Sequence, residues 1–160
     1  MSSRIAVMFA GEILQIGAPD EVYDDPNHLK VARFISNPGL NTLPFGAVAN
    51  TAWGRQIGSL INGGARDCTV GFRPEACTIA TSREHSDLDG RLVFCERFGA
   101  EAFAHIASDQ AETPIIARVE PAAAARLHAD QLVRLRFDAD KIFLFDANGS
   151  RMRIRARAVA

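Results

Sequence analysis

The stretch Val70-Gly71-Phe72-Arg73-Pro74-Glu75 decides the fold, because an apolar run ends there at a charged corner that contains a proline. Pro74 fixes its own φ angle, lacks a backbone N–H and pushes Arg73 into an extended conformation. The stretch therefore predicts the end of a strand followed by a turn. Arg73 and Glu75 flank the proline ring and are placed to pair with each other, so we predict that they hold the corner together.

The chain around and after this corner is typical of short antiparallel strands. The expected strands are Cys68–Phe72, Gly90–Phe98, Glu101–Ala107, Ile115–Val119, Gln131–Phe137 and Ile142–Phe145. Within 133–137 the strict alternation directs the apolar residues inward and sends Arg134 and Arg136 to solvent. Many short strands separated by turn signals predict a mainly β fold, an OB-like antiparallel barrel.

The first 40 residues have a different pattern. Two apolar runs, at 5–8 and 13–16, predict a β-hairpin. Pro19 starts a short helix that ends at Asp25-Pro26, and Asn27 is expected to cap a second helix that stops at Asn37-Pro38-Gly39. We therefore divide the chain into an N-terminal segment (1–38), a β domain (39–150) and a basic tail (151–160).

Composition narrows the class of protein. The chain has 160 residues, of which 48% are hydrophobic, and this is enough for a real core. We expect no membrane span and no secretion signal, because there is no apolar run of about 18 residues and no basic-then-apolar start. A net charge of −1 argues against a general nucleic-acid binder.

The C-terminus is the one basic part of the chain, because four arginines lie there at alternate positions. They are Arg151, Arg153, Arg155 and Arg157. An extended tail would place their guanidinium groups on one side, where they could meet phosphates or acidic lipids; the other interpretation is a frayed tail. Together with the strand residues Arg134 and Arg136, Arg151 and Arg153 are our candidate patch for an anion or a partner.

Sequence motifs for catalysis are missing. The chain has no phosphate loop of the G-x-x-x-x-G-K-[ST] type, no G-x-G-x-x-G, no G-x-S-x-G and no H-E-x-x-H. Its three cysteines lack C-x-x-C spacing, which fits a reducing cytosol, and its four histidines are far apart. We expect no catalytic residue, no cofactor site and no metal site.

Residues spread over positions 4 to 150 match a known family at the right intervals. In the first part these are Arg4-Ile5-Ala6-Val7-Met8, Gly11, Gln15, Gly17, Pro19, Glu21, Tyr23, Pro26, Val31-Ala32, Phe34-Ile35, Pro38 and Asn41. In the second part they are Gly71-Phe72-Arg73-Pro74-Glu75, Gly90, Glu96, Phe98-Gly99, Glu101, Phe145-Asp146 and Gly149. The first set resembles the end of the nucleotide-binding domain in ATPase subunits of ABC importers for sugars, glycerol phosphate, polyamines or ferric ion. The second set resembles the C-terminal regulatory region of the same subunits, the TOBE domain of OB-like fold. One departure is Ala18, where the family usually has Ser or Thr as a helix cap.

The resemblance implies a non-catalytic region for regulation and dimerisation, in which Gly71, Arg73, Pro74 and Glu75 are the family motif. All ATP-hydrolysis motifs of the family precede the matched part, so ATP and Mg²⁺ would belong to the missing upstream region. The implied partners are a second copy of the subunit, membrane permease subunits, and a regulatory protein or small-molecule effector. The implied location is the cytoplasmic face of the inner membrane.

The residues also permit a function of another class. An OB-like module acting alone could bind a small oxyanion or an oligonucleotide through its arginine-bearing strands. Against the oligonucleotide, no aromatic residues are interleaved with the C-terminal arginines to stack on bases.

Overall fold

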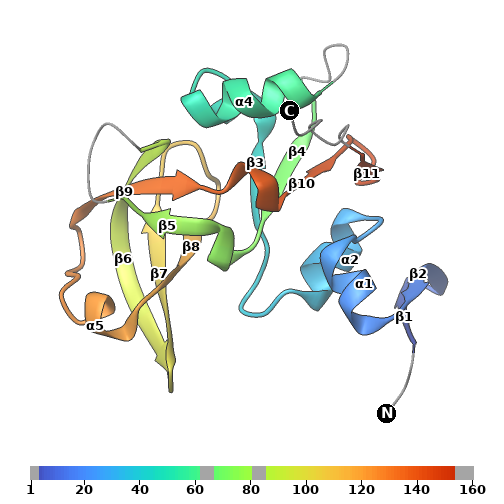
Figure 1. Ribbon diagram of the computed structural model, residues 1–160, viewed down its shortest axis with the longest axis horizontal. Helices are drawn as coiled ribbons and strands as arrows, with labels where there is room; N and C mark the ends of the chain where they lie inside the picture. The colour runs from blue at the N-terminus through green and yellow to red at the C-terminus, as the bar shows by residue number, and fades with distance from the viewer. Residues whose placement is uncertain (1–3, 62–66, 81–85, 154–160) are drawn as a thin grey trace, which may run out of the picture.

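The computed structural model describes residues 4–61, 67–80 and 86–153 (Figure 1). The N-terminal elements are β1 (Ile5–Phe9), β2 (Glu12–Gly17), α1 (Pro19–Asp24) and α2 (Leu29–Ile35). Next come β3 (Asn41–Pro44), α3 (Phe45–Val48), α4 (Ala52–Leu60), β4 (Thr69–Phe72), the 3₁₀ turn η1 (Pro74–Ala76) and β5 (Cys77–Ile79). The remaining elements are β6 (Leu88–Phe98), β7 (Glu101–Ala107), β8 (Ile115–Val119), α5 (Pro121–Ala124), β9 (Leu132–Phe137), the 3₁₀ turn η3 (Ala139–Lys141), β10 (Ile142–Phe145) and β11 (Arg151–Met152). None of the described helices is long and apolar enough to cross a membrane.

Apart from the β1–β2 hairpin, the strands form two antiparallel sheets. One has four strands in the order β11-β10-β4-β3, and the other has five in the order β5-β9-β6-β7-β8. The predicted mainly β, antiparallel fold is confirmed. The described strands do not close into one barrel, because they are divided between these two sheets.

Two corners carry the chain from one sheet to the other. The Arg73-Pro74-Glu75 corner leads from β4 in the four-stranded sheet to β5 in the five-stranded sheet, and η3 leads back from β9 to β10. The corners are hydrogen-bonded to each other, since the backbone N–H of Asp138 donates to the carbonyl of Ala76 at 2.9 Å. The strand end and turn predicted at Pro74 are therefore a switch between sheets.

One hydrophobic core fills the space between the two sheets and the helix α4. At its centre Trp53 stacks on Phe137 with ring centroids 4.3 Å apart, and Phe72 meets both rings edge-on at 5.8 and 4.9 Å. Trp53 and Phe72 are almost completely buried. Because these aromatic residues come from α4, β4 and β9, each makes a large apolar contribution to holding helix and sheets together.

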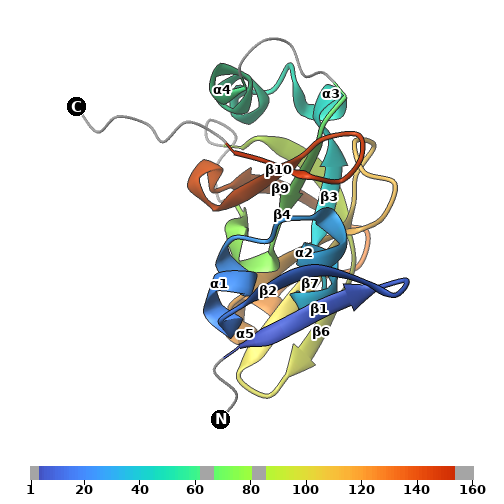
Figure 2. The same cartoon turned by 90° about the vertical axis from the view of Figure 1, so that its right-hand side faces the viewer.

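The N-terminal segment has a small core of its own, made of Val7, Val22 and Val31. It also packs against the β domain, where Ala32 of α2 forms a buried cluster with Phe143 and Phe145 of β10. Figure 2 shows α1 and α2 beside the lower end of the four-stranded sheet.

Several predicted elements are found in the structure and others were missed. The hairpin, the two N-terminal helices and the strands 101–107, 115–119 and 142–145 are observed. The strands β3, β5 and β11 and the helices α3 and α4 were not predicted. The cap of α2 was assigned to the wrong residue: it is His28, whose Nδ1 accepts from the N–H of Lys30 at 3.0 Å. Ala18 begins α1 without a side-chain acceptor, and the carboxylate of Glu21 instead accepts from the Ala18 N–H at 3.3 Å.

Candidate functional site

The two predicted corner residues are not paired with each other. Within the described residues Arg73 and Glu75 form no ion pair, and both contact Tyr23 of α1 instead. The guanidinium of Arg73 lies over the Tyr23 ring, 3.5 Å from its centroid, and donates to the Tyr23 carbonyl. The Tyr23 hydroxyl donates to Glu75 at 3.1 Å. The corner therefore binds the N-terminal segment, across about fifty residues of sequence.

The local sequence explains why Arg73 reaches this position. Pro74 holds Arg73 extended, with φ −85° and ψ 161°, at the end of β4. The neighbouring Gly71 is tightly packed, since a Cβ there would lie 3.0 Å from the Phe145 ring. Pro74 thus shapes the backbone and Gly71 leaves room for the Phe145 ring, while Arg73 and Glu75 make the contacts.

Arg73 is an unusually buried cation. It is 6% exposed, and its Nε has no hydrogen-bond partner in the described part of the chain. A buried charge without a carboxylate partner is costly, and burial lowers the pKa of this guanidinium, an effect that Tyr23 and Glu75 oppose. The faces of Tyr23 and of Phe143, whose centroid is 4.8 Å away, supply part of the compensation through cation–π contacts.

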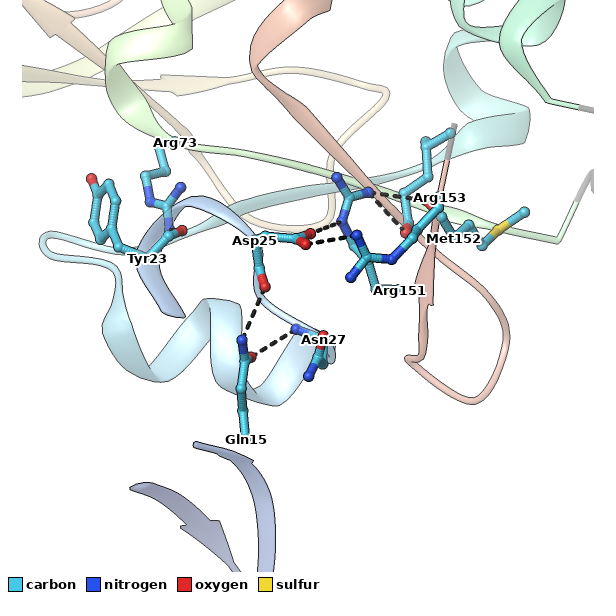
Figure 3. A network of polar contacts seen from close by, with 9 residues as sticks. Gln15, Tyr23, Asp25, Asn27, Arg73, Arg151, Met152 and Arg153 are labelled. Carbon is cyan, nitrogen blue, oxygen red and sulfur yellow. Dashed lines mark hydrogen bonds and ion pairs between the residues drawn. The ribbon is translucent and has the colours of Figure 1, made fainter. Parts of the chain in front are cut away.

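Arg151 enters the same region from β11. Its guanidinium is 5.0 Å from the Phe143 centroid, and its Nη1 donates to the carbonyls of Leu144 at 3.4 Å and Met152 at 3.1 Å. Figure 3 shows Arg151 and Arg153 next to each other, both facing the Asp25 carboxylate from the same side. Arg153 makes the short contact, 2.8 Å from Nη1 to Oδ2, while Arg151 Nε lies 3.9 Å from Oδ1, too far for a hydrogen bond.

Asp25 is held in place by Gln15 of β2 (Figure 3). The Gln15 amide donates to the Asp25 carbonyl at 3.0 Å and accepts from the N–H of Asn27 at 2.8 Å. The backbone continues the connection, because the N–H of Arg151 donates to the carbonyl of Asn27 at 2.8 Å. Residues 15–27 and β11 therefore form one polar junction.

The predicted basic tail needs correction in its first part. Arg151 and Met152 form β11, which pairs with β10, and the Arg151 side chain is only 14% exposed. Burial lowers the pKa of Arg151, and the nearby Asp25 opposes this shift. Arg153 is exposed but ion-paired, and Arg155 and Arg157 lie outside the described residues.

The four arginines of the predicted patch are divided between the two sheets. Arg134 and Arg136 lie on β9 in the five-stranded sheet, where Arg134 is 3.8 Å from Asp89, whereas Arg151 and Arg153 lie on and beside β11 in the other sheet. The structure instead gathers Arg73, Arg151 and Lys141 around one cavity of about 380 Å³. Sequence reasoning missed Lys141 and the aromatic residues Tyr23 and Phe143 as members of this site.

The cavity is lined by α1, by the Arg73 corner, by η3 with β10, and by β11. Its other lining residues are Asp24, Glu75, Ala76, Asp140 and Ile142. Arg73 is buried and Arg151 is partly buried, while the carboxylates and Lys141 are exposed. In the described part of the chain no group of three His, Cys, Asp or Glu residues is arranged to hold a metal ion.

Comparison with known proteins places the chain in a family. Residues 70–145, which span from β4 to β10, match the TOBE domain. The chain is 32% identical to the alpha-glucoside transport ATP-binding protein AglK of Rhizobium meliloti (strain 1021), over 96% of the chain and 44% of that protein. It is 35% identical to the sn-glycerol-3-phosphate import ATP-binding protein UgpC of Brucella abortus biovar 1 (strain 9-941), over 95% of the chain and 42% of the relative. It is also 34% identical to the spermidine/putrescine import ATP-binding protein PotA of Mesorhizobium japonicum, over 70% of the chain and 33% of the relative.

The chain thus spans less than half the length of the relatives it matches. The match includes residues on both sides of the junction, because it covers nearly the whole chain. Residues 70–145 belong to the TOBE domain family, and the chain as a whole corresponds to the C-terminal part of the ATP-binding subunits of ABC importers.

Proposed function

We propose that the chain is the non-catalytic regulatory and dimerisation region of an importer ATP-binding subunit that serves sugars or related solutes. Residues 1–38 would be the end of the ATP-binding domain and 39–150 the regulatory domain, and the first two residues of the basic segment 151–160 form β11 in the sheet of that domain. The observation that carries the proposal is the contact of Arg73, in the family motif, with Tyr23 in the preceding segment. This contact gives the regulatory domain a direct mechanical connection to the segment before it.

The solute class rests on the relatives. AglK is named for alpha-glucosides and UgpC for sn-glycerol-3-phosphate, and both match more than nine-tenths of the chain. In the complete subunit, ATP and Mg²⁺ would bind upstream of the matched region. The subunit would work at the cytoplasmic face of the inner membrane, against permease subunits, and would receive a regulatory protein or a small effector.

The position of the junction suggests how regulation could act. Tyr23, Asp25 and Gln15 belong to the segment before the β domain. Tyr23 donates a hydrogen bond to Glu75 at the corner, Asp25 is ion-paired with Arg153 next to β11, and Gln15 holds Asp25 in place. A partner that moves the β domain would therefore pull on α1 and on the β1–β2 hairpin. A signal received by the TOBE domain would reach the ATP-binding domain by this route.

ATP turnover by the purified 160-residue chain tests the first part of the proposal. We expect no phosphate release above a buffer blank, with full-length AglK of Rhizobium meliloti as the positive control. Specific turnover that survives further purification of the chain would overturn the non-catalytic assignment.

Sedimentation velocity tests dimerisation separately. We expect the sedimentation coefficient of the chain to rise with protein concentration in the micromolar range and to fit a monomer–dimer equilibrium. A monomer at the highest soluble concentration would overturn dimerisation while leaving the result on turnover unaffected.

A further inference from the structure

The cavity at the junction has a distribution of charge that is suited to a small ligand. Arg73 is buried and Arg151 is partly buried beside it, and the Asp25 carboxylate, which is near Arg151, is bound at short distance by Arg153 rather than by Arg151. In the described residues Arg73 has no ion-pair partner at all. Arg73 is therefore a cation of the cavity lining with which an anionic group can pair.

The cavity lining also contains carboxylates. The exposed carboxylates in the lining are those of Asp24, Glu75 and Asp140. Lys141 also lines the cavity, and its amine is 3.5 Å from the Asp138 carboxylate. Carboxylates accept hydrogen bonds from hydroxyl groups, and they repel a second anionic group. A ligand with one anionic end and a hydroxyl-bearing body would suit both the cations and the carboxylates of the lining.

The missing hydrogen-bond partner of Arg73 is an independent observation that points to a ligand. It is more than nine-tenths buried, it lines the cavity, its Nε lacks a hydrogen-bond partner among described residues, and its one hydrogen bond goes to the Tyr23 carbonyl. Buried polar groups normally have partners, and each exception calls for an explanation. Guanidinium groups bind phosphate and carboxylate through paired N–H donors, which a lysine cannot reproduce.

We propose that this cavity is a binding site for a small polyhydroxylated anion, such as a sugar phosphate or a sugar acid. The anionic group binds to Arg73 and Arg151, with Lys141 as a third cation, and the hydroxyl groups donate to Asp24, Glu75 and Asp140. The cavity of about 380 Å³ lies in the size range of small-molecule sites.

The site also joins the two parts of the chain. Tyr23 and Asp24 come from α1, while the other members come from the β domain. A ligand that contacts both sides stabilises the docked arrangement by mass action, because it binds only when the junction is closed. This makes the cavity a site through which a small molecule can regulate the coupling between the two parts.

Isothermal titration calorimetry on the purified chain at low salt tests the proposal with three probes. Glucose 6-phosphate carries both recognised groups, inorganic phosphate carries the anion alone, and glucose carries the hydroxyl groups alone. We expect saturable binding at one site per chain for glucose 6-phosphate, binding at least tenfold weaker for phosphate, and no detectable binding for glucose. Gluconate is the matching carboxylate probe, and its affinity decides between the phosphate and the carboxylate form of the ligand.

Variants show whether binding occurs in this cavity. We expect Arg73→Gln and Lys141→Ala each to weaken glucose 6-phosphate binding about tenfold or more, since each loses a charged hydrogen bond. Lys141 is exposed, so its variant reports on binding even if Arg73→Gln fails to fold. Arg126→Gln, an exposed arginine on α5's C-terminal side and outside the cavity, is the control that changes net charge equally.

The outcomes separate clearly. Binding that is lost in the Lys141 variant and kept in the Arg126 control supports the site. Binding that is equal in all variants, or the absence of saturable binding to both glucose 6-phosphate and gluconate, overturns it. Neither result depends on ATP turnover or on dimerisation, so failure here leaves the proposed function as it stands.

Discussion

The guanidinium of Arg73 lies 3.5 Å from the centroid of the Tyr23 ring and donates a hydrogen bond to the carbonyl of the same tyrosine. One side chain of the family motif thus binds both the ring and the backbone of a helix fifty residues earlier in the chain. Because a guanidinium can stack and donate at the same time, an arginine is required for this pair of contacts.

We expect Arg73→Ala to lower the free energy of unfolding by about 2 to 4 kcal/mol, through loss of a charged hydrogen bond, of the cation–π contact and of packing. Arg73→Lys should recover less than half of the loss, since an ammonium cannot stack flat on Tyr23. Urea unfolding followed by circular dichroism measures both variants. Equal stability of the parent and Arg73→Ala would show that the corner does not need this side chain.

The hydrogen bond between Tyr23 and Glu75 should make a smaller contribution. It is solvent-exposed and 3.1 Å long, so we expect Glu75→Ala and Tyr23→Phe each to cost about 1 kcal/mol or less. A double-mutant cycle isolates the pair, and the two effects should be less than additive. Full additivity would mean that the two side chains stabilise the corner independently of each other.

Gly54 offers a test in which packing opposes helix propensity. It lies in α4, where alanine normally favours the helix by about 1 kcal/mol over glycine. A Cβ at this position, however, would meet the Val48 carbonyl oxygen at a distance far below van der Waals contact. We expect Gly54→Ala to lower the melting temperature by several degrees, since overpacking costs about 1 to 3 kcal/mol.

Gly46 provides the matched control for this substitution. It lies in α3, and a Cβ there would meet nothing within 4 Å. Gly46→Ala should therefore leave the melting temperature unchanged or raise it slightly. A melting temperature that rises in the Gly54 variant as well would contradict the close approach of α4 to the end of α3.

Asp87 should give the stability of the chain a measurable pH dependence. Burial raises the pKa of its carboxyl above the ordinary value, although the Phe137 N–H donates to it at 2.9 Å and opposes the shift. The folded state therefore binds the proton more tightly than the unfolded state does. The contribution of Asp87 to the free energy of unfolding is highest below its pKa in the unfolded state. It declines as pH rises from the unfolded-state pKa to the folded-state pKa, and it is constant above the folded-state pKa.

Thermal melts between pH 3.5 and 7 of the parent and of Asp87→Asn test this sign. The asparagine keeps an acceptor for Phe137 but cannot ionise, so the melting temperature of the variant relative to the parent should increase as pH rises through this interval. A difference that does not change with pH would show that Asp87 titrates equally in the folded and unfolded states.

Local sequence determined much of this protein. Pro74 and the turn residues located the strand ends, and the alternation at 133–137 correctly placed Val133, Leu135 and Phe137 in the core. These features follow from φ restriction and from the two-residue period of a strand, which act within a few residues. The residues that matched a known family also identified its TOBE domain, which the comparisons confirm.

Tertiary structure decided the rest, because it depends on contacts between distant residues. The helices α3 and α4 were not predicted, and the packing of Trp53 on Phe72 and Phe137 holds α4 in place. The partner of Arg73 is Tyr23, on a helix that no local pattern links to β4, rather than the nearby Glu75. Arg151 is likewise partly buried at the junction and not free in a tail, because β11 pairs with β10 and brings it to Phe143 and Asp25. The sequence alone determined which side chains carry charge, and the fold determined which of them meet.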